Sequence, residues 1–249
     1  MENLYDPGKE SLLTKIKIAA WRTNRFLSDR IGSIFSSRVL SDFKKGFGRV
    51  KTFSEALDFS QDFKSMWYNI RPLQNKVEFT DFISFLRSRK TSLRNIMEIG
   101  TANGGTLFLF SQIAEHGGFV LSLDKYHPPK WKKSLFVMFS NSVKIKLVFG
   151  NSFKNKTVEA VNNAIMPEKL DLLFIDADHT YQGIKNDFAR FVPFVKDGGI
   201  VAFHDIIPGS GNGVPLFYND LKKKYESFEF KQRTYGWGGI GIIIYKKQN

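Results

Sequence analysis

Beyond about residue 90, short apolar runs alternate with segments of helical character, and this alternation constrains the fold more than any other feature. Five apolar runs each precede a turn, and we predict them as strands over residues 95–99, 119–123, 144–149, 170–175 and 199–203. Helices are expected over residues 105–115, 130–140, 155–165, 181–195 and 214–225. Such alternation indicates a parallel sheet with right-handed crossovers.

The end of the chain follows a different pattern. "SFEFKQR" (227–233) and "GIGIIIYKK" (239–247) read as two strands separated by a glycine-rich bend, which suits an antiparallel hairpin at one edge of the sheet. We therefore predict an α/β fold with a doubly wound, Rossmann-like, mostly parallel seven-stranded sheet. Residues 1–90 look helical and irregular, so we expect a helical amino-terminal extension followed by one domain over residues 91–249.

Composition narrows the class of protein. A chain of 249 residues with 42% hydrophobic content can fill one core and a smaller appendage. The absence of cysteine excludes disulfides, thiolate metal sites and a cysteine nucleophile. We recognise no signal peptide and no apolar run near the roughly 18 residues that cross a bilayer. We expect a cytoplasmic protein, either soluble or peripheral to a membrane.

The formal charge of +13 fits three kinds of partner: nucleic acid, an anionic membrane surface or an acidic substrate. Much of the excess lies in stretches such as "KYHPPKWKK" and "LKKKY", which are typical of solvated helix faces. The charge therefore does not choose among these partners.

The first predicted strand ends in an acid and meets a glycine-broken turn, "NIMEIGTANGGTLFLF" over residues 95–110. Open α/β sheets bind ligands at such strand-to-helix corners. The turn has neither the Walker pattern nor G-x-G-x-x-G, so it is not typical of a phosphate cradle.

A second acid, Asp124, ends the next predicted strand. In this position a carboxylate can accept both hydroxyls of a ribose. A nucleoside without phosphates would need that carboxylate, close backbone approach over the glycines, and polar groups for its own amine and carboxylate. S-adenosylmethionine is such a ligand.

Over roughly residues 90 to 247 the sequence resembles the class I S-adenosylmethionine-dependent methyltransferases. "MEIGTANGGT" resembles their first cofactor motif and "LSLD" the second, while "GNS" at 150–152 follows the third strand, where the family meets the adenine. The resemblance implies contacts to the methionine amino group from Glu98, to the cofactor from the Gly100 and Gly104 backbone, to its carboxylate from Thr106, to the ribose from Asp124, and to the adenine from Ser152.

"LLFIDADHTYQGIKNDF" and "KDGGIVAFHDI" resemble the fourth and fifth strands of one subgroup. It includes the caffeoyl-CoA, catechol and macrolide-sugar O-methyltransferases and the cephalosporin-hydroxylase-like enzymes. Its metal-dependent members imply a site for Mg²⁺ or another divalent metal at Asp176, His204 and Asp205. This chain has His-Asp where those relatives carry Asp-Asn or an acidic pair, and His204 is alternatively a packed histidine beside the cofactor.

Three polar residues leave the fourth predicted strand at its carboxyl end, facing the crevice: Asp176, Asp178 and His179. Methyl transfer to a hydroxyl needs a group that removes the proton, and a histidine that is neutral near pH 7 suits this role. We expect His179 to be that base, with Tyr181 as the alternative. Asp176 is expected to contact the cofactor or the acceptor, whereas Asp178 or Thr180 could instead cap the next helix.

The amino-terminal segment "LLTKIKIAAWRTNRFLSDRIGSIF" is loosely amphipathic and basic. A membrane-surface helix, a substrate lid and a dimerisation arm all fit it. We favour a lid or dimer element, because a small-molecule methyltransferase must cover its acceptor, and "FKSMWYNI" could line that pocket.

The sequence thus predicts an O-methyltransferase acting on a small hydroxylated acceptor, such as a sugar or glycosylated metabolite. Base-amino methyltransferases resemble one another in an Asn/Asp-Pro-Pro-aromatic turn where this chain reads "DADH". An RNA methyltransferase, a non-catalytic adenosyl-binding module and a hydroxylase on the same scaffold remain as alternatives.

Overall fold

The computed structural model of the protein describes residues 23, 27, 29–31, 33–89, 92–140, 142–208, 213–232 and 238–247. Most of the predicted amphipathic segment, residues 12–35, lies outside this range. Ahead of the main sheet, the structure contains α2 (Ser36–Phe47), α3 (Phe53–Asp62), β1 (Lys64–Ser65), β2 (Tyr68–Asn69) and α4 (Lys76–Ser88).

The rest of the described chain alternates strand and helix, and then ends in two strands. In order, the elements are β3 (Asn95–Ile99), α5 (Gly105–Ile113), β4 (Phe119–Asp124), α6 (Lys130–Val137), β5 (Lys144–Phe149), α7 (Asn155–Ile165), β6 (Leu170–Ile175), α8 (Tyr181–Phe191), a 3₁₀ turn (Val192–Phe194), β7 (Val195–His204), α9 (Val214–Lys222), β8 (Ser227–Phe230) and β9 (Ile240–Ile244).

These strands form one seven-stranded sheet in the order β5-β4-β3-β6-β7-β9-β8. Strands β3 to β7 pair in parallel, whereas β9 runs antiparallel to both β7 and β8. The predicted fold class is confirmed, including the antiparallel carboxyl-terminal pair. Strand order reverses beside β3, so the carboxyl ends of β3, β4 and β6 meet at the crevice.

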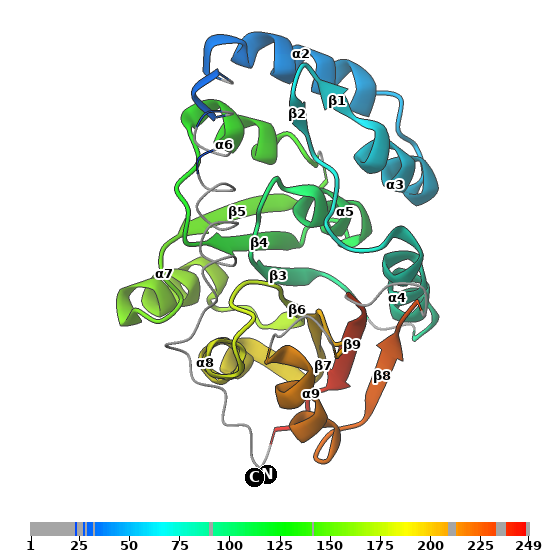
Figure 1. Cartoon of the computed structure of the whole chain (residues 1–249), viewed down its shortest axis with the longest axis vertical. Helices are drawn as coiled ribbons and strands as arrows, with labels where there is room; N and C mark the ends of the chain where they lie inside the picture. Colours follow the sequence, from blue (N-terminus) through cyan, green and yellow to red (C-terminus); the bar gives the residue numbers. More distant parts are fainter. Residues whose placement is uncertain are drawn as a thin grey trace.

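Helices cover both faces of the sheet. In Figure 1, α2, α3 and α6 lie toward one end of the molecule and α7, α8 and α9 toward the other, with the sheet between them. Successive side chains of β6 point to opposite faces: Leu172 and Phe174 enter one core, and Leu173 and Ile175 the other. Burial on both faces explains why β6 is an unbroken apolar run apart from Asp171.

Two adjoining elements differ from the prediction, because the helix expected over residues 181–195 is shorter and the strand expected over residues 199–203 is longer. The α-helix ends at Phe191 and is followed by the 3₁₀ turn, and β7 begins at Val195. Pro193 lies in this turn. A proline has no N–H to donate to a helical hydrogen bond, so the α-helix cannot continue through it.

The amino-terminal helices pack against one face of the sheet domain. The ring of Phe43 in α2 is fully buried, with its centroid 6.0 Å from that of Phe108 in α5 and 5.2 Å from that of Phe139. Phe79 in α4 lies 5.8 Å from Phe110 in the same way. The helices α2 to α4 therefore share one hydrophobic core with α5 and α6.

Candidate active site

The turn after β3 depends on glycine for reasons of packing. Gly100 has φ +102°, and a Cβ there would lie 2.0 Å from the backbone oxygen of Asp176. Gly104 has φ +88°, and a Cβ there would lie 2.5 Å from the ring of Phe136 and 2.9 Å from that of Phe139. A side chain at Gly104 would therefore meet these two aromatic rings, so packing alone requires glycine there.

Glu98 lies at the base of this turn and is fully buried. Its Oε1 accepts a hydrogen bond from the Ser122 hydroxyl at 2.8 Å, while Oε2 has no hydrogen-bond partner in the described part of the chain. Burial raises the pKa of Glu98 to about 8, although the hydrogen bond from Ser122 acts to lower it. The charges of Asp124 and Asp176 add to the rise. A buried carboxyl with a free oxygen fits an ammonium group, which is what the resemblance implies.

Asp124 ends β4 and closes the same turn. One carboxylate oxygen accepts from the backbone N–H groups of Thr101 at 3.1 Å and Ala102 at 3.2 Å, and the other accepts from Tyr126 at 2.7 Å. These bonds fix the carboxylate where the crevice opens. Binding of a ribose by Asp124 stays a prediction.

Ser152 follows β5, and a buried acid from a distant helix lies close to it. Asp187 of α8 has no exposed surface, and burial raises its pKa to about 6 against a contact with the Ser152 hydroxyl. That contact is too loose to count as a formed hydrogen bond. Sequence analysis missed Asp187, although it is spaced three and four residues from the buried Ile184 and Phe191.

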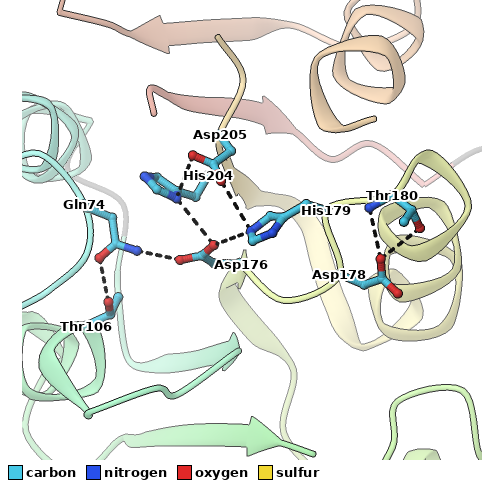
Figure 2. Close-up of polar contacts among 8 residues, drawn as sticks. All are labelled: Gln74, Thr106, Asp176, Asp178, His179, Thr180, His204 and Asp205. Atoms are coloured by element: carbon cyan, nitrogen blue, oxygen red, sulfur yellow. Dashed lines mark hydrogen bonds and ion pairs between the residues drawn. The ribbon is translucent and has the colours of Figure 1, made fainter. Parts of the chain in front are cut away.

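Two acids and two histidines meet where β6 and β7 end (Figure 2). His179 Nε2 lies 3.3 Å from Asp176 Oδ1 and 3.3 Å from Asp205 Oδ2. His204 Nδ1 lies 3.4 Å from Asp176 Oδ1 and 3.4 Å from Asp205 Oδ1. Asp205 has φ +65°, an unusual conformation for a residue other than glycine, and such strain is often found at functional sites.

The charges in this cluster stabilise one another. Burial alone would raise the pKa of Asp176, but the His204 charge and hydrogen bonds from both histidines hold it well below its usual range. Burial alone would lower the pKa of His204, yet the charge of Asp176 leads a rise to about 9. The hydrogen bond that His179 donates to the Asp176 carboxylate is the main cause of a raised pKa at His179. A raised pKa means that His179 holds its proton more tightly than a free imidazole does.

Three of these side chains could hold a metal ion. One ligand atom from each of Asp176, His179 and Asp205 lies within 4.8 Å of the other two. The predicted set contained His204 in place of His179. His204 Nδ1 faces the same two carboxylates, but the set whose ligand atoms lie within 4.8 Å of one another in the described residues contains His179.

Asp178 serves the helix rather than the crevice. Its Oδ1 accepts from the Thr180 backbone N–H at 3.0 Å and from the Thr180 hydroxyl at 2.8 Å (Figure 2). The Thr180 hydroxyl oxygen in turn caps α8 by accepting from the Gly183 N–H at 2.9 Å. The capping role is confirmed for Thr180, and Asp178 supports that cap through its two hydrogen bonds with Thr180.

Gln74 is a site residue that the sequence did not reveal. It belongs to the amino-terminal extension, and its side chain lies between Thr106 of the cofactor turn and Asp176 of the cluster (Figure 2). It is 102 residues from Asp176 in the sequence, and no motif marks it. Only the packing of the extension over the sheet brings it there.

Comparison with known proteins places this geometry in a family. A family model described as a methyltransferase domain matches residues 97–206, which span the cofactor turn and the acid-histidine cluster. Residues 97–206 are a methyltransferase domain. The recognised resemblance is thereby confirmed.

Two curated relatives and three solved structures extend the comparison. An uncharacterised protein of Sinorhizobium fredii is 25% identical over 174 residues, 62% of this chain and 17% of its own length. One of Acanthamoeba polyphaga mimivirus is 30% identical over 115 residues, 44% of this chain and 50% of its own. This chain therefore spans half or less of the curated relatives it matches.

The solved structures share the fold of this methyltransferase domain. They include an O-methyltransferase from Bacillus cereus in complex with SAH (TM-score 0.52, 15% identity, covering 82% of this chain and 97% of that one). TomG from Streptomyces achromogenes, an O-methyltransferase in complex with SAM, aligns with a TM-score of 0.53 and 16% identity, covering 83% of this chain and 96% of its own. MycE of the mycinamycin biosynthetic pathway, in complex with Mg and SAH, aligns over 80% of this chain and 56% of its own (0.50, 15%).

No helix among the described residues is both long enough and apolar enough to cross a membrane. The basic amino-terminal segment, for which we expected a lid, dimerisation or membrane-surface role, lies mostly outside those residues. Further along the same extension, Tyr68 of "FKSMWYNI" donates a hydrogen bond to the Asn103 carbonyl at 2.7 Å. This part of the extension therefore touches the cofactor turn directly.

Proposed function

We propose that this methyltransferase transfers the methyl group of S-adenosylmethionine to a hydroxyl of a small molecule. The observation that carries the proposal is Glu98, whose buried free carboxyl oxygen lies beside the glycine turn and needs a cationic partner. The methionine ammonium of the cofactor meets that need. Asp124 and Ser152 stand at the next two strand ends, where the ribose and the adenine would follow.

The chemistry requires little beyond placement and proton removal. The acceptor oxygen forms a bond to the methyl carbon while the carbon–sulfur bond breaks and its electron pair returns to sulfur. The hydroxyl proton leaves to a base. We assign that role to His179, whose side chain is about half exposed (47%) at the crevice.

A divalent cation fits the same cluster. Carboxylates suit Mg²⁺ and Mn²⁺, and the imidazole of His179 shifts the preference of Asp176, His179 and Asp205 toward Mn²⁺. Such an ion would lower the pKa of an acceptor hydroxyl. The Nε2 atom of His179 can serve as base or as ligand, but one lone pair cannot do both at once. The structural relative MycE, in complex with Mg and SAH, supports the cation.

For the acceptor we propose a sugar or glycosylated metabolite. The support is the resemblance to the macrolide-sugar subgroup and the structure of MycE with Mg, SAH and mycinamycin VI. The absence of an Asn/Asp-Pro-Pro-aromatic turn, at a position that reads "DADH", supports a hydroxyl over a base amino group.

Calorimetry with S-adenosylhomocysteine (SAH), the demethylated cofactor, tests the proposal. The parent should bind SAH, and Asp124→Ala should bind it at least tenfold more weakly, since a charge-assisted pair of hydrogen bonds is lost. Asp58→Asn, an exposed acid paired with Lys76, is the matched control and should bind like the parent. Tighter binding of a nicotinamide dinucleotide than of SAH would refute the cofactor assignment.

Chelation tests the cation, and His179→Ala tests the base. Methyl transfer should stop in excess chelator and return when Mn²⁺ is added. If His179 is the base, His179→Ala should bind SAH normally but lose on the order of 10²–10⁴-fold in single turnovers. If it is instead a ligand, His179→Ala should weaken Mn²⁺ binding. Full turnover in chelator would show that Asp176 acts without a metal.

A further inference from the structure

Gln74 connects the two halves of the proposed site through its side-chain amide (Figure 2). Its Nε2 donates to Asp176 Oδ2 at 2.6 Å, and its Oε1 accepts from the Thr106 hydroxyl at 2.9 Å. The residue is 5% exposed, so both hydrogen bonds are shielded from water. Shielded hydrogen bonds to a charged group are stronger than those at the surface.

The chemistry of the neighbours fixes which way the amide points. The carboxylate of Asp176 has no proton to donate, so the amide NH₂ must face it. The carbonyl oxygen is then left for Thr106, which has a single hydroxyl proton to give. Thr106 cannot give that proton to Gln74 and to the cofactor carboxylate at the same time.

The backbone around Gln74 is held on one side by the cofactor turn and on the other by the start of α4. Before it, a Cβ at Gly105 would lie 2.3 Å from the Ile70 carbonyl oxygen and 2.5 Å from the Pro72 nitrogen, so the segment packs directly on the start of α5. After it, Asn75 caps α4 by accepting from the Val77 N–H at 2.9 Å. Gln74 is thus positioned by the fold and does not depend on its own two contacts.

The bond from Gln74 also decides which oxygen Asp176 presents to the cluster. Gln74 occupies Oδ2, whereas Oδ1 faces His179 Nε2 and His204 Nδ1. Residues that hold a metal ligand from behind often change metal affinity by 10-fold to 100-fold when they are removed.

We propose that Gln74 is a positioning residue that couples the cofactor-carboxylate end of the site, through Thr106, to the cation-binding oxygen of Asp176. When the cofactor takes the Thr106 proton, Gln74 loses its donor and its hold on Asp176 changes. This inference rests on the proposed function, because it concerns the cofactor and cation of that same site. It adds a thermodynamic link between them.

The experiment is a mutant cycle read by Mn²⁺ binding in the full chain, with and without saturating SAH. We expect Gln74→Met to bind Mn²⁺ about tenfold more weakly than the parent. Thr106 is not a proposed ligand of the cation. Thr106→Val should nevertheless weaken Mn²⁺ binding about threefold in the parent background and have no further effect in Gln74→Met. SAH should change the Mn²⁺ affinity of the parent but not that of Gln74→Met.

Ser111→Ala is the matched control, because Ser111 is another buried hydroxyl of α5 and donates to the carbonyls of Phe108 and Phe139. It should leave Mn²⁺ affinity unchanged. If Gln74→Met unfolds at a lower temperature than the parent, Gln74→Leu is measured in its place.

Three results would overturn the inference, and they are distinguishable from failure of the proposed function. Independent, additive effects of Thr106→Val and Gln74→Met would show that no relay exists. Unchanged Mn²⁺ affinity in Gln74→Met would show that Asp176 needs no such support. A parent that binds SAH but not Mn²⁺ would remove both the relay and the cation, whereas a parent that binds neither would refute the proposed function itself.

Discussion

Around Gly100 the protein shapes its crevice with backbone, whereas around Asp176 it does so with four ionisable side chains. The turn has no room for a Cβ at Gly100, and its acid, Glu98, is left with one free oxygen. At the cluster, each carboxylate already faces two histidine nitrogens. The comparison teaches that the backbone turn leaves a buried carboxyl oxygen of Glu98 unpaired, whereas the cluster pairs its opposite charges and leaves His204 Nε2 without a hydrogen-bond partner among the described residues.

The largest effect should come from Gly100→Ala, which tests the rigidity of the backbone region. Its Cβ would be forced against the Asp176 carbonyl oxygen at a positive φ, so we expect a loss of about 3 kcal/mol or more in unfolding free energy. Gly198→Ala is the control, since it also has a positive φ (+73°) but meets nothing within 4 Å. It should lose only about 1 kcal/mol. Equal losses in urea unfolding would mean that the close approach is unimportant.

Glu98 should make cofactor binding depend on pH. With a pKa of about 8, Glu98 favours its protonated form at pH 7, whereas an ammonium ligand requires the carboxylate. SAH affinity should therefore rise by up to about tenfold per pH unit as the pH increases from 6 to 8, with release of one proton on binding. Calorimetry in buffers of different ionisation enthalpy measures that proton.

Glu98→Gln is the companion variant. It should bind SAH on the order of 100-fold more weakly at pH 8 and show no such pH dependence, because the amide does not titrate. The parent should lose folding stability as the pH rises from about 4.5 to about 8, because the folded state retains the Glu98 proton over this range and the unfolded state does not. Glu98→Gln should not show this loss. An unchanged pH profile in the variant would assign the titration to another group.

Asp176→Asn tests whether the cluster is held together by its charges. The Asp176 charge is the main cause that raises the pKa of His204 to about 9, so its removal should lower that pKa by one unit or more toward 6.5. Proton titration of the histidine by NMR measures the change. A His204 that still titrates near 9 would show that Asp205 and Glu78 suffice.

The smallest effect is expected at Asp178, which lies two residues from Asp176 but directs its hydrogen bonds to Thr180. Asp178→Ala should cost about 1 kcal/mol of stability through a weaker helix cap. Binding of SAH and Mn²⁺ should not change. A loss of Mn²⁺ affinity would move Asp178 into the cation site.

The sequence predicted the sheet well because its signals are local. The runs 95–99 and 170–175 became β3 and β6 without change, since strands buried on both faces stay apolar throughout. Because ligands bind at the carboxyl ends of parallel strands, the sequence also predicted that Asp176 and Asp205 lie in one site, although they are 29 positions apart.

What the sequence could not supply was contact between distant segments. Gln74 joins the site only because the amino-terminal extension packs on α5, and Asp187 lies near Ser152 only because α8 contacts the start of α7, just after Ser152. The grouping of His179 with Asp176 and Asp205 depends on where the three side chains lie in space, which a linear pattern does not show.

The shared core of Phe43, Phe79, Phe108, Phe110 and Phe139 has a practical consequence. A truncated chain that began at residue 91 would retain every residue of the family match, yet it would expose the apolar face that α2, α3 and α4 now cover. Such a surface drives aggregation. Crystallisation of this protein should therefore use the whole chain. Destabilising mutations in α2 to α4 should reduce the yield of folded protein even though they lie outside the proposed site.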